Sequence, residues 1–155
     1  MLRTYLQDHH AGATVGVELA RRAAGSNSES DYGPELDRLA EEIAADRETL
    51  EQVMGGLGVK PSTIKDAAGW TAEKLGRLKP NNSLLSYSPL SRVVEFEGLV
   101  IGVTGKIALW ESLRSALGES LDGIDLAALA ERAADQRSRL EGLRKRAAAE
   151  AFKNG

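Results

Sequence analysis

The sequence predicts an all-α protein, a single domain built as a bundle of four long helices. Apolar residues recur at alternating spacings of three and four along the predicted helices, and proline or glycine marks most of their ends. No stretch shows the alternation of a strand, and 155 residues suffice for one domain with a substantial core. We expect the domain to span 1–155, with long helices at about 2–24, 34–54, 89–117 and 124–152 and a short one at 61–75.

The helix at 89–117 is expected to lie at the centre of the bundle. Ser88 can cap its first turn, Pro89 suits the first helical position, and Gly118 suits the end. Its apolar stripe comprises Val93, Phe96, Val100, Val103, Ile107 and Trp110. Burial is also expected for the flanking residues Leu99, Ile101 and Leu109. A helix that crosses a bilayer needs roughly 20 consecutive apolar residues. The charges at Glu97 and Lys106 divide the apolar sequence of this helix into shorter stretches, so no membrane span is expected.

The other three long helices are bounded by similar signals. Gly25 closes the first helix, Pro34 opens the second, and Gly55 with Gly56 ends it. The last helix is expected from about Ile124. Short loops make the first and last helix pairs antiparallel hairpins, whereas the long middle connection lets the second and third helices run parallel.

This layout resembles the ferritin-like four-helix bundle proteins, which have one long crossover. The resemblance covers the whole chain. It consists of the order of helices and loops and the spacing of apolar residues, and not of a specific motif. The di-metal members carry Glu-x-x-His on two helices. Neither Glu42 nor Glu131 has a histidine three residues later, and the only histidines, His9 and His10, share the first helix. A conventional di-iron centre is therefore not expected.

Four polar residues are predicted at similar depths in the bundle, on or beside the apolar stripes: His9, Asp46, Thr104 and Gln136. They can form a closed hydrogen-bonded layer that fixes the helix register, or a site for a ligand or one divalent metal, or they can fail to cluster. The candidate metal ligands are His9, His10, Glu18, Asp46 and Glu97. No cofactor is the first expectation, and a single divalent metal is the alternative.

Small residues on two helices indicate a second feature. Gly12 and Gly16 match the depths of Gly98 and Gly102 if the first and third helices are antiparallel neighbours. Close helix–helix contact is the favoured interpretation, and a groove that admits an apolar ligand is the alternative. Lys106 is expected to extend its ammonium group to water and not to act as a catalytic amine.

Composition excludes several classes of function. A net charge of −3 gives no support for nucleic-acid binding, and the absence of cysteine excludes disulfides, thiolate metal sites and cysteine nucleophiles. The first residues lack the apolar core of a signal peptide, so a cytoplasmic location is expected. We expect a non-catalytic binding or interaction protein, with metal binding as the alternative. A homo-oligomer stays open, through apolar residues of the crossover at Trp70, Leu84, Leu85 and Tyr87.

Overall fold

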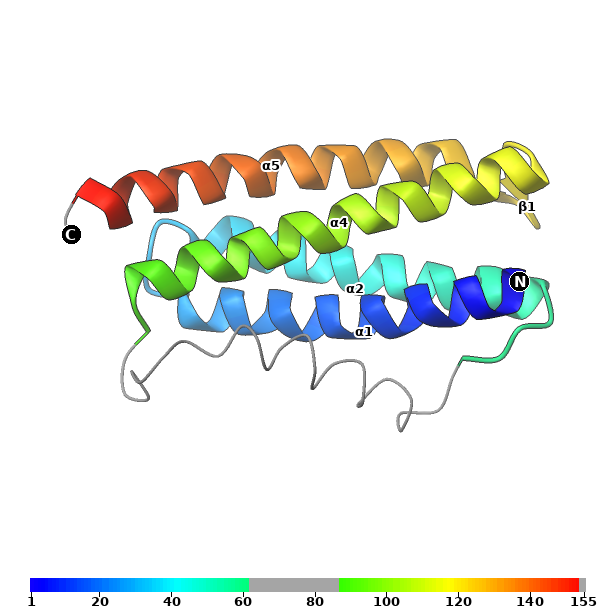
Figure 1. Cartoon of the computed structure of the whole chain (residues 1–155), viewed down its shortest axis with the longest axis horizontal. Helices are drawn as coiled ribbons and strands as arrows, with labels where there is room; N and C mark the ends of the chain where they lie inside the picture. Colours follow the sequence, from blue (N-terminus) through cyan, green and yellow to red (C-terminus); the bar gives the residue numbers. More distant parts are fainter. Residues whose placement is uncertain (62–86, 154–155) are drawn as a thin grey trace.

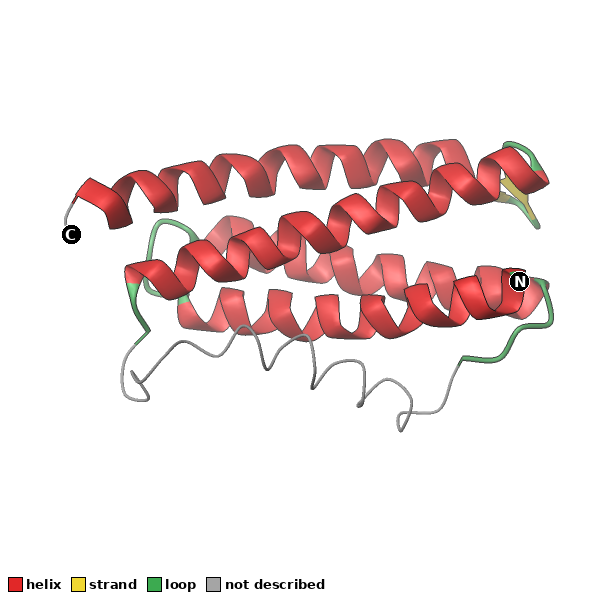
Figure 2. Cartoon of the chain, in the orientation of Figure 1, coloured by secondary structure: helices red, strands yellow, loops and turns green. Residues whose placement is uncertain are grey.

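The computed structural model describes residues 1–61 and 87–153, and four long helices account for most of them (Figure 2). The helices are α1 (Leu2–Ser26), α2 (Gly33–Gly56), α4 (Pro89–Leu117) and α5 (Leu126–Lys153). The predicted all-α fold is confirmed, and the helix bounds agree with the expected ones to within two residues. Nearly all of the expected short helix at 61–75 lies outside the described residues.

The helices form two antiparallel hairpins, α1 with α2 and α4 with α5 (Figure 1). As expected from the long connection, α2 and α4 run in the same direction (Figure 1). In the described part of the chain the closest helix pairs are α4–α5, α1–α2 and α1–α4. The bundle is therefore held together along α4, which contacts its hairpin partner and also the first hairpin.

The expectation of no strand is wrong at one short turn. β1 (Ser120–Leu121) and β2 (Ile124–Asp125) form a two-stranded antiparallel hairpin that precedes α5. Asp122 and Gly123 connect them with φ angles of 49° and 82°. Asp-Gly is favoured in a two-residue turn of this kind, because both central residues need positive φ. Since Ile124 and Asp125 belong to the hairpin, α5 begins at Leu126, two residues later than expected.

The predicted capping of α4 is confirmed. Ser88 Oγ accepts a hydrogen bond from the Ser91 amide at 3.1 Å, which satisfies a donor of the first turn. At the other end Gly118 adopts a φ of 96°, a conformation that favours glycine. In α5, Asp125 Oδ1 accepts from the Ala128 amide at 2.9 Å and caps the helix directly after the hairpin.

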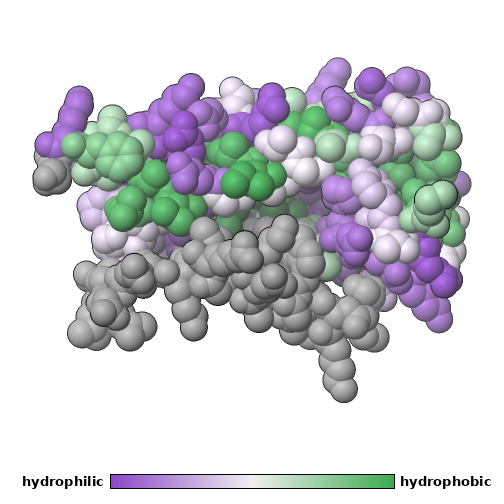
Figure 3. Space-filling view, viewed as in Figure 1, coloured by the Kyte–Doolittle hydropathy of each residue, from purple (hydrophilic) through white to green (hydrophobic). Residues whose placement is uncertain are grey.

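The apolar stripe of α4 lies in the core. Val93, Phe96, Val103 and Trp110 are buried, as are Leu99 and Leu109 beside them, while Val100 and Ile107 are partly buried. Ile101 contradicts the prediction, because 73% of it is exposed. α4 packs mainly against α5 and α1, and among the described residues these contacts leave Ile101 largely uncovered. Apolar atoms accordingly reach the surface in patches over α4 and α5 (Figure 3).

Candidate functional site

A buried polar layer joins α2 and α5. Asp46 is 3% exposed and Gln136 is fully buried. Gln136 Nε2 donates a hydrogen bond to Asp46 Oδ2 at 3.0 Å. The structure thus brings together two of the four residues predicted for this layer.

Lys106 of α4 completes the layer, contrary to the expectation that its ammonium group extends to water. Its Nζ donates to Asp46 Oδ2 and to Gln136 Oε1, both at 2.5 Å, and its side chain is only 15% exposed. Arg132 pairs with the other oxygen, Asp46 Oδ1. Burial lowers the pKa of Lys106, and the negative charge of Asp46 opposes that shift. The layer therefore consists of one carboxylate between two cations, with an amide to fix its orientation.

The layer continues to the outer surface between α2 and α5. Gln136 Nε2 also lies 3.2 Å from Glu42 Oε2, and Glu42 Oε1 accepts from Arg139 at 2.9 Å. Arg139 donates in addition to Glu35 at 2.6 Å and to Asp135 at 2.9 Å. Long charged side chains therefore bridge α2 and α5, which are not among the closest helix pairs in the described residues.

His9 and Thr104 do not hydrogen-bond within this layer. Thr104 is exposed, and its hydroxyl donates to the Val100 carbonyl of its own helix at 2.8 Å. It lies about 100° around α4 from the buried Val103, which turns it away from the core. His9 is half-buried and packs edge-on against Tyr5, with 4.5 Å between the ring centroids.

The burial of His9 has a measurable consequence. Desolvation lowers the pKa of His9 below 6.5, although Asp8 opposes the shift. As pH falls through 6.5 the unfolded chain takes up this proton before the folded chain does, so stability present above that pH is lost below it. We expect a His9 midpoint below 6.5 in an NMR titration, with the two histidines assigned by His10→Gln. His9→Gln should flatten the pH dependence of unfolding between pH 5 and 7, and a His9 midpoint above 6.5 would contradict the effect of burial.

The five predicted metal ligands are not gathered around one point. His10 Nε2 contacts Glu51 at 2.9 Å, and Glu18 and Glu97 are exposed. Asp46 uses both of its oxygens on the cations and the amide of the polar layer. Within residues 1–61 and 87–153, no three His, Asp or Glu side chains form a group that could hold a metal ion.

The predicted glycines line a cavity of about 600 Å³ between α1 and α4, with α2 contributing to its wall. A Cβ atom placed on Gly98 would lie 3.0 Å from Leu19 Cδ2, so the two helices are closely packed at that point. A Cβ atom on Gly16, Gly102 or Gly105 would have no described residue within 4 Å. Of the predicted contact residues, Gly98 is closely packed, whereas Gly16 and Gly102, like the neighbouring Gly105, have no described atom near their Cβ positions.

The cavity has an apolar part and a polar end. Its apolar lining comprises Ala13, Val15, Leu19, Ile43, Leu50, Val94, Ile101 and Leu109. The polar end includes Lys106 and Asp46 of the buried layer, together with His9 and Arg47. The buried layer is thus also part of the cavity wall, a relation that the sequence analysis did not predict.

Two buried donors in the cavity lining have no hydrogen-bond acceptor among the described residues. They are the indole Nε1 of Trp110, a fully buried residue, and Nε of Arg47. Arg47 Nε lies 3.5 Å from Glu51, in an ion pair without hydrogen-bond geometry. Such donors cost about 1–3 kcal/mol each when buried without a partner. Sequence periodicity places Trp110 in the core but does not show whether its N–H finds an acceptor.

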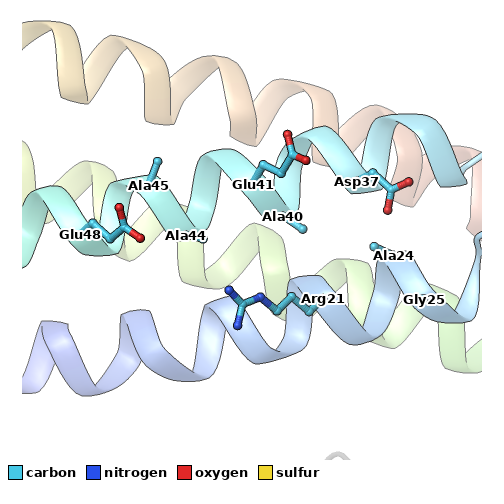
Figure 4. A pocket seen from close by; sticks show the side chains of 9 residues that line it. All are labelled: Arg21, Ala24, Gly25, Asp37, Ala40, Glu41, Ala44, Ala45 and Glu48. Atoms are coloured by element: carbon cyan, nitrogen blue, oxygen red, sulfur yellow. The ribbon is translucent and has the colours of Figure 1, made fainter.

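A second hollow lies on the outside of the bundle between α1 and α2 (Figure 4). Ala24, Ala40 and other small residues line it, with Arg21 from α1 and acidic side chains such as Asp37 and Glu41 from α2. All of its charged side chains are exposed. We interpret it as the surface of a close packing seam, because small residues let two helices approach.

Tyr87, the described member of the predicted apolar strip, belongs to a hydrogen-bonded cluster at the start of α4. Its hydroxyl donates to Glu95 Oε2 at 2.9 Å and accepts from Asn27 Nδ2 at 2.8 Å. Asn27 Oδ1 in turn accepts from Arg92 Nε at 2.6 Å. Burial is the main cause that raises the pKa of Tyr87 to about 12. This cluster ties α4 to the α1–α2 loop, while Trp70, Leu84 and Leu85 lie outside the described residues.

None of the described helices combines the length and the apolar character needed to cross a membrane. Comparison with family models, with curated proteins and with solved structures gives no match for this chain.

Proposed function

We propose that the protein is a non-catalytic binding protein, and that its ligand is a small, mainly apolar molecule held between α1 and α4. The observation that carries this proposal is the glycine-lined cavity of about 600 Å³. Pockets that hold small molecules measure about 300–1,000 Å³, are mainly apolar and contain a few polar groups. The cavity agrees with this description in size and in lining.

The glycines support this proposal because they weaken the helices that carry them. A glycine inside a helix costs about 1 kcal/mol relative to alanine. At Gly98 close packing against Leu19 offsets the cost, but no described side chain uses the room at Gly16, Gly102 or Gly105. Room for a bound molecule accounts for these three positions.

The layout of the bundle supports the same class of function. We propose a ferritin-like arrangement, in which two hairpins and one crossover build ligand sites between facing helices. A di-metal centre is not part of the proposal, because the histidine motif is missing and Asp46 is already paired with Lys106 and Arg132.

The proposal can be tested with Nile red, a neutral dye whose fluorescence rises in apolar sites. We expect the native protein to bind the dye, and Gly16→Leu or Gly102→Leu to weaken binding by about tenfold or more, equal to about 1.4 kcal/mol. The leucine side chain would fill part of the cavity. Both positions are helical, and neither has a described atom within 4 Å of its Cβ position.

Gly142→Leu is the matched control. Gly142 is exposed within α5, has open space around its Cβ position among the described residues, and does not line the cavity. All three substitutions raise helix propensity by a similar amount, up to about 1 kcal/mol, so impaired folding would not explain a selective loss of binding. Absence of dye binding to the native protein, or equal binding by all three variants, would overturn the proposal.

A further inference from the structure

We infer that the ligand of this cavity is a free single-chain carboxylate, with its carboxylate group beside Lys106 and its hydrocarbon chain along the glycine-lined part. This inference rests on the proposed binding function and adds the chemical class of the ligand. It follows from three features of the cavity: its length, its unpartnered donors and its charge.

The cavity is elongated along α4 and changes in polarity from one end to the other. Val94 lies at the apolar end and Lys106 at the polar end, and a rise of 1.5 Å per residue places them about 18 Å apart along the helix axis. Gly98, Ile101 and Gly102 lie between them on the same wall. A long, narrow ligand with one polar end matches this distribution better than a compact ring does.

The polar end has more hydrogen-bond donors than acceptors. An ammonium group has three N–H donors, and Lys106 uses two of them on Asp46 and Gln136. Trp110 Nε1, four residues further along α4, and Arg47 Nε, next to Asp46 on α2, have no acceptor among the described residues. A carboxylate accepts hydrogen bonds at two oxygens and donates none, so it supplies what this end lacks.

The charge of the polar end also favours an anion. Asp46 is the only described carboxylate paired with Lys106, and it is shared with Arg132. Arg132 does not line the cavity, but of the lining side chains at this end that are not exposed, Lys106 and Arg47 are cationic and Asp46 is anionic, which leaves one net positive charge. The other acids of the cavity lining, Asp8 and Glu97, are exposed, and Glu97 lies near the apolar end, 3.6 Å from Arg144. Hydrogen bonds between charged groups are roughly twice as strong as those between neutral groups, which is enough to select between head groups.

The test compares three ligands that share one chain and differ in the head group. Dodecanoate, dodecanol and dodecylamine are titrated against the Nile red complex below their micelle concentrations. We expect dodecanoate to displace the dye at a concentration lower by about tenfold or more than dodecanol, and dodecylamine to be the weakest. Lys106→Met should remove the preference, so that the affinity for dodecanoate falls by about tenfold or more relative to the affinity for dodecanol.

Two further variants separate head-group recognition from a general loss of structure. Lys145→Met removes an equal charge from an exposed side chain of α5 and should leave the preference unchanged. Trp110→Phe keeps an aromatic ring but removes the indole N–H, and should weaken dodecanoate more than dodecanol. Circular dichroism of each variant verifies its helical content.

The outcomes distinguish this inference from the proposed function. Equal displacement by dodecanoate and dodecanol, or an unchanged preference in Lys106→Met, would overturn the carboxylate assignment while the apolar binding site stands. Dye binding that none of the three ligands displaces would also overturn it. Failure of the native protein to bind Nile red at all would instead remove the proposed function itself.

Discussion

Replacing Asp46 by alanine is expected to lower the free energy of unfolding by about 3 kcal/mol, the lower end of the range for breaking a buried ion pair. The substitution leaves Lys106 inside the bundle without its counter-ion and removes an acceptor from Gln136. The lower end applies because 15% of the Lys106 side chain is exposed, so water can reach part of it. Urea denaturation followed by circular dichroism measures the change.

A double substitution separates the buried charge from the volume of the side chains. Lys106→Met alone should cost less than Asp46→Ala, because Asp46 keeps its contacts with Arg132 and Gln136. Asp46→Leu combined with Lys106→Met should recover part of the loss, since an apolar pair of similar volume often replaces a buried ion pair without penalty. Asp135→Ala is the control: its pair with Arg139 is 62% exposed on the aspartate side, and such pairs contribute about 1 kcal/mol or less. Equal losses for Asp46→Ala and Asp135→Ala would show that Asp46 is not a buried counter-ion.

Replacing Phe96 by alanine is expected to destabilise the protein by about 3–5 kcal/mol, the usual cost of removing a buried aromatic ring. Phe96 is fully buried in α4, and its ring centroid lies 5.6 Å from that of Tyr32. The substitution therefore removes apolar burial and an aromatic contact between α4 and the start of α2. The same denaturation experiment measures it.

The chain provides its own control for this prediction, because it has two phenylalanines and the second is Phe152. Phe152 lies near the end of α5 and is 68% exposed, so Phe152→Ala should change the free energy of unfolding by no more than about 0.5 kcal/mol. Similar effects at both positions would contradict the placement of Phe96 in the core.

The helices could be predicted because their signals are local. Periodic apolar residues and the caps at Ser88 and Gly118 act within a few residues of the helix that they define. The β1–β2 hairpin also has a local signal, Asp122-Gly123 between two apolar residues, but it lay within a segment interpreted as loop and helix. The turn signal at Asp122-Gly123 competed with the helical pattern that follows it, so the start of α5 was predicted two residues too early, and the arrangement of the helices was unaffected.

The candidate site could be predicted only in part because it depends on the rotation and separation of helices. Counting residues along the helices correctly placed Asp46 near Gln136. The directions of Thr104 and Lys106 depend on the rotation of α4 about its axis, and the stripe of apolar residues defines that rotation only coarsely. The glycines present the same difficulty. Gly98 and Gly102 are four residues apart on one helix, yet one is closely packed and the other borders a cavity. That difference depends on the distance between helix axes, which no local pattern records.

The side of the bundle between α2 and α5 is held together largely by polar and charged side chains, whereas the other sides have closely packed backbones. Where backbones lie close together, as in α4–α5, the core side chains between them make apolar contacts that dissolved ions do not screen. On the α2–α5 side the inner part of the link is the buried Gln136–Asp46 bond. Its outer part consists of Arg139 with Glu35 and Glu42, whose side chains are 27%, 29% and 32% exposed. Dissolved ions screen partly exposed charges, over a distance of about 8 Å at physiological ionic strength. The two hairpins are consequently joined by outer ion pairs between α2 and α5 that salt weakens, and by packing between α1 and α4 that does not depend on these charges.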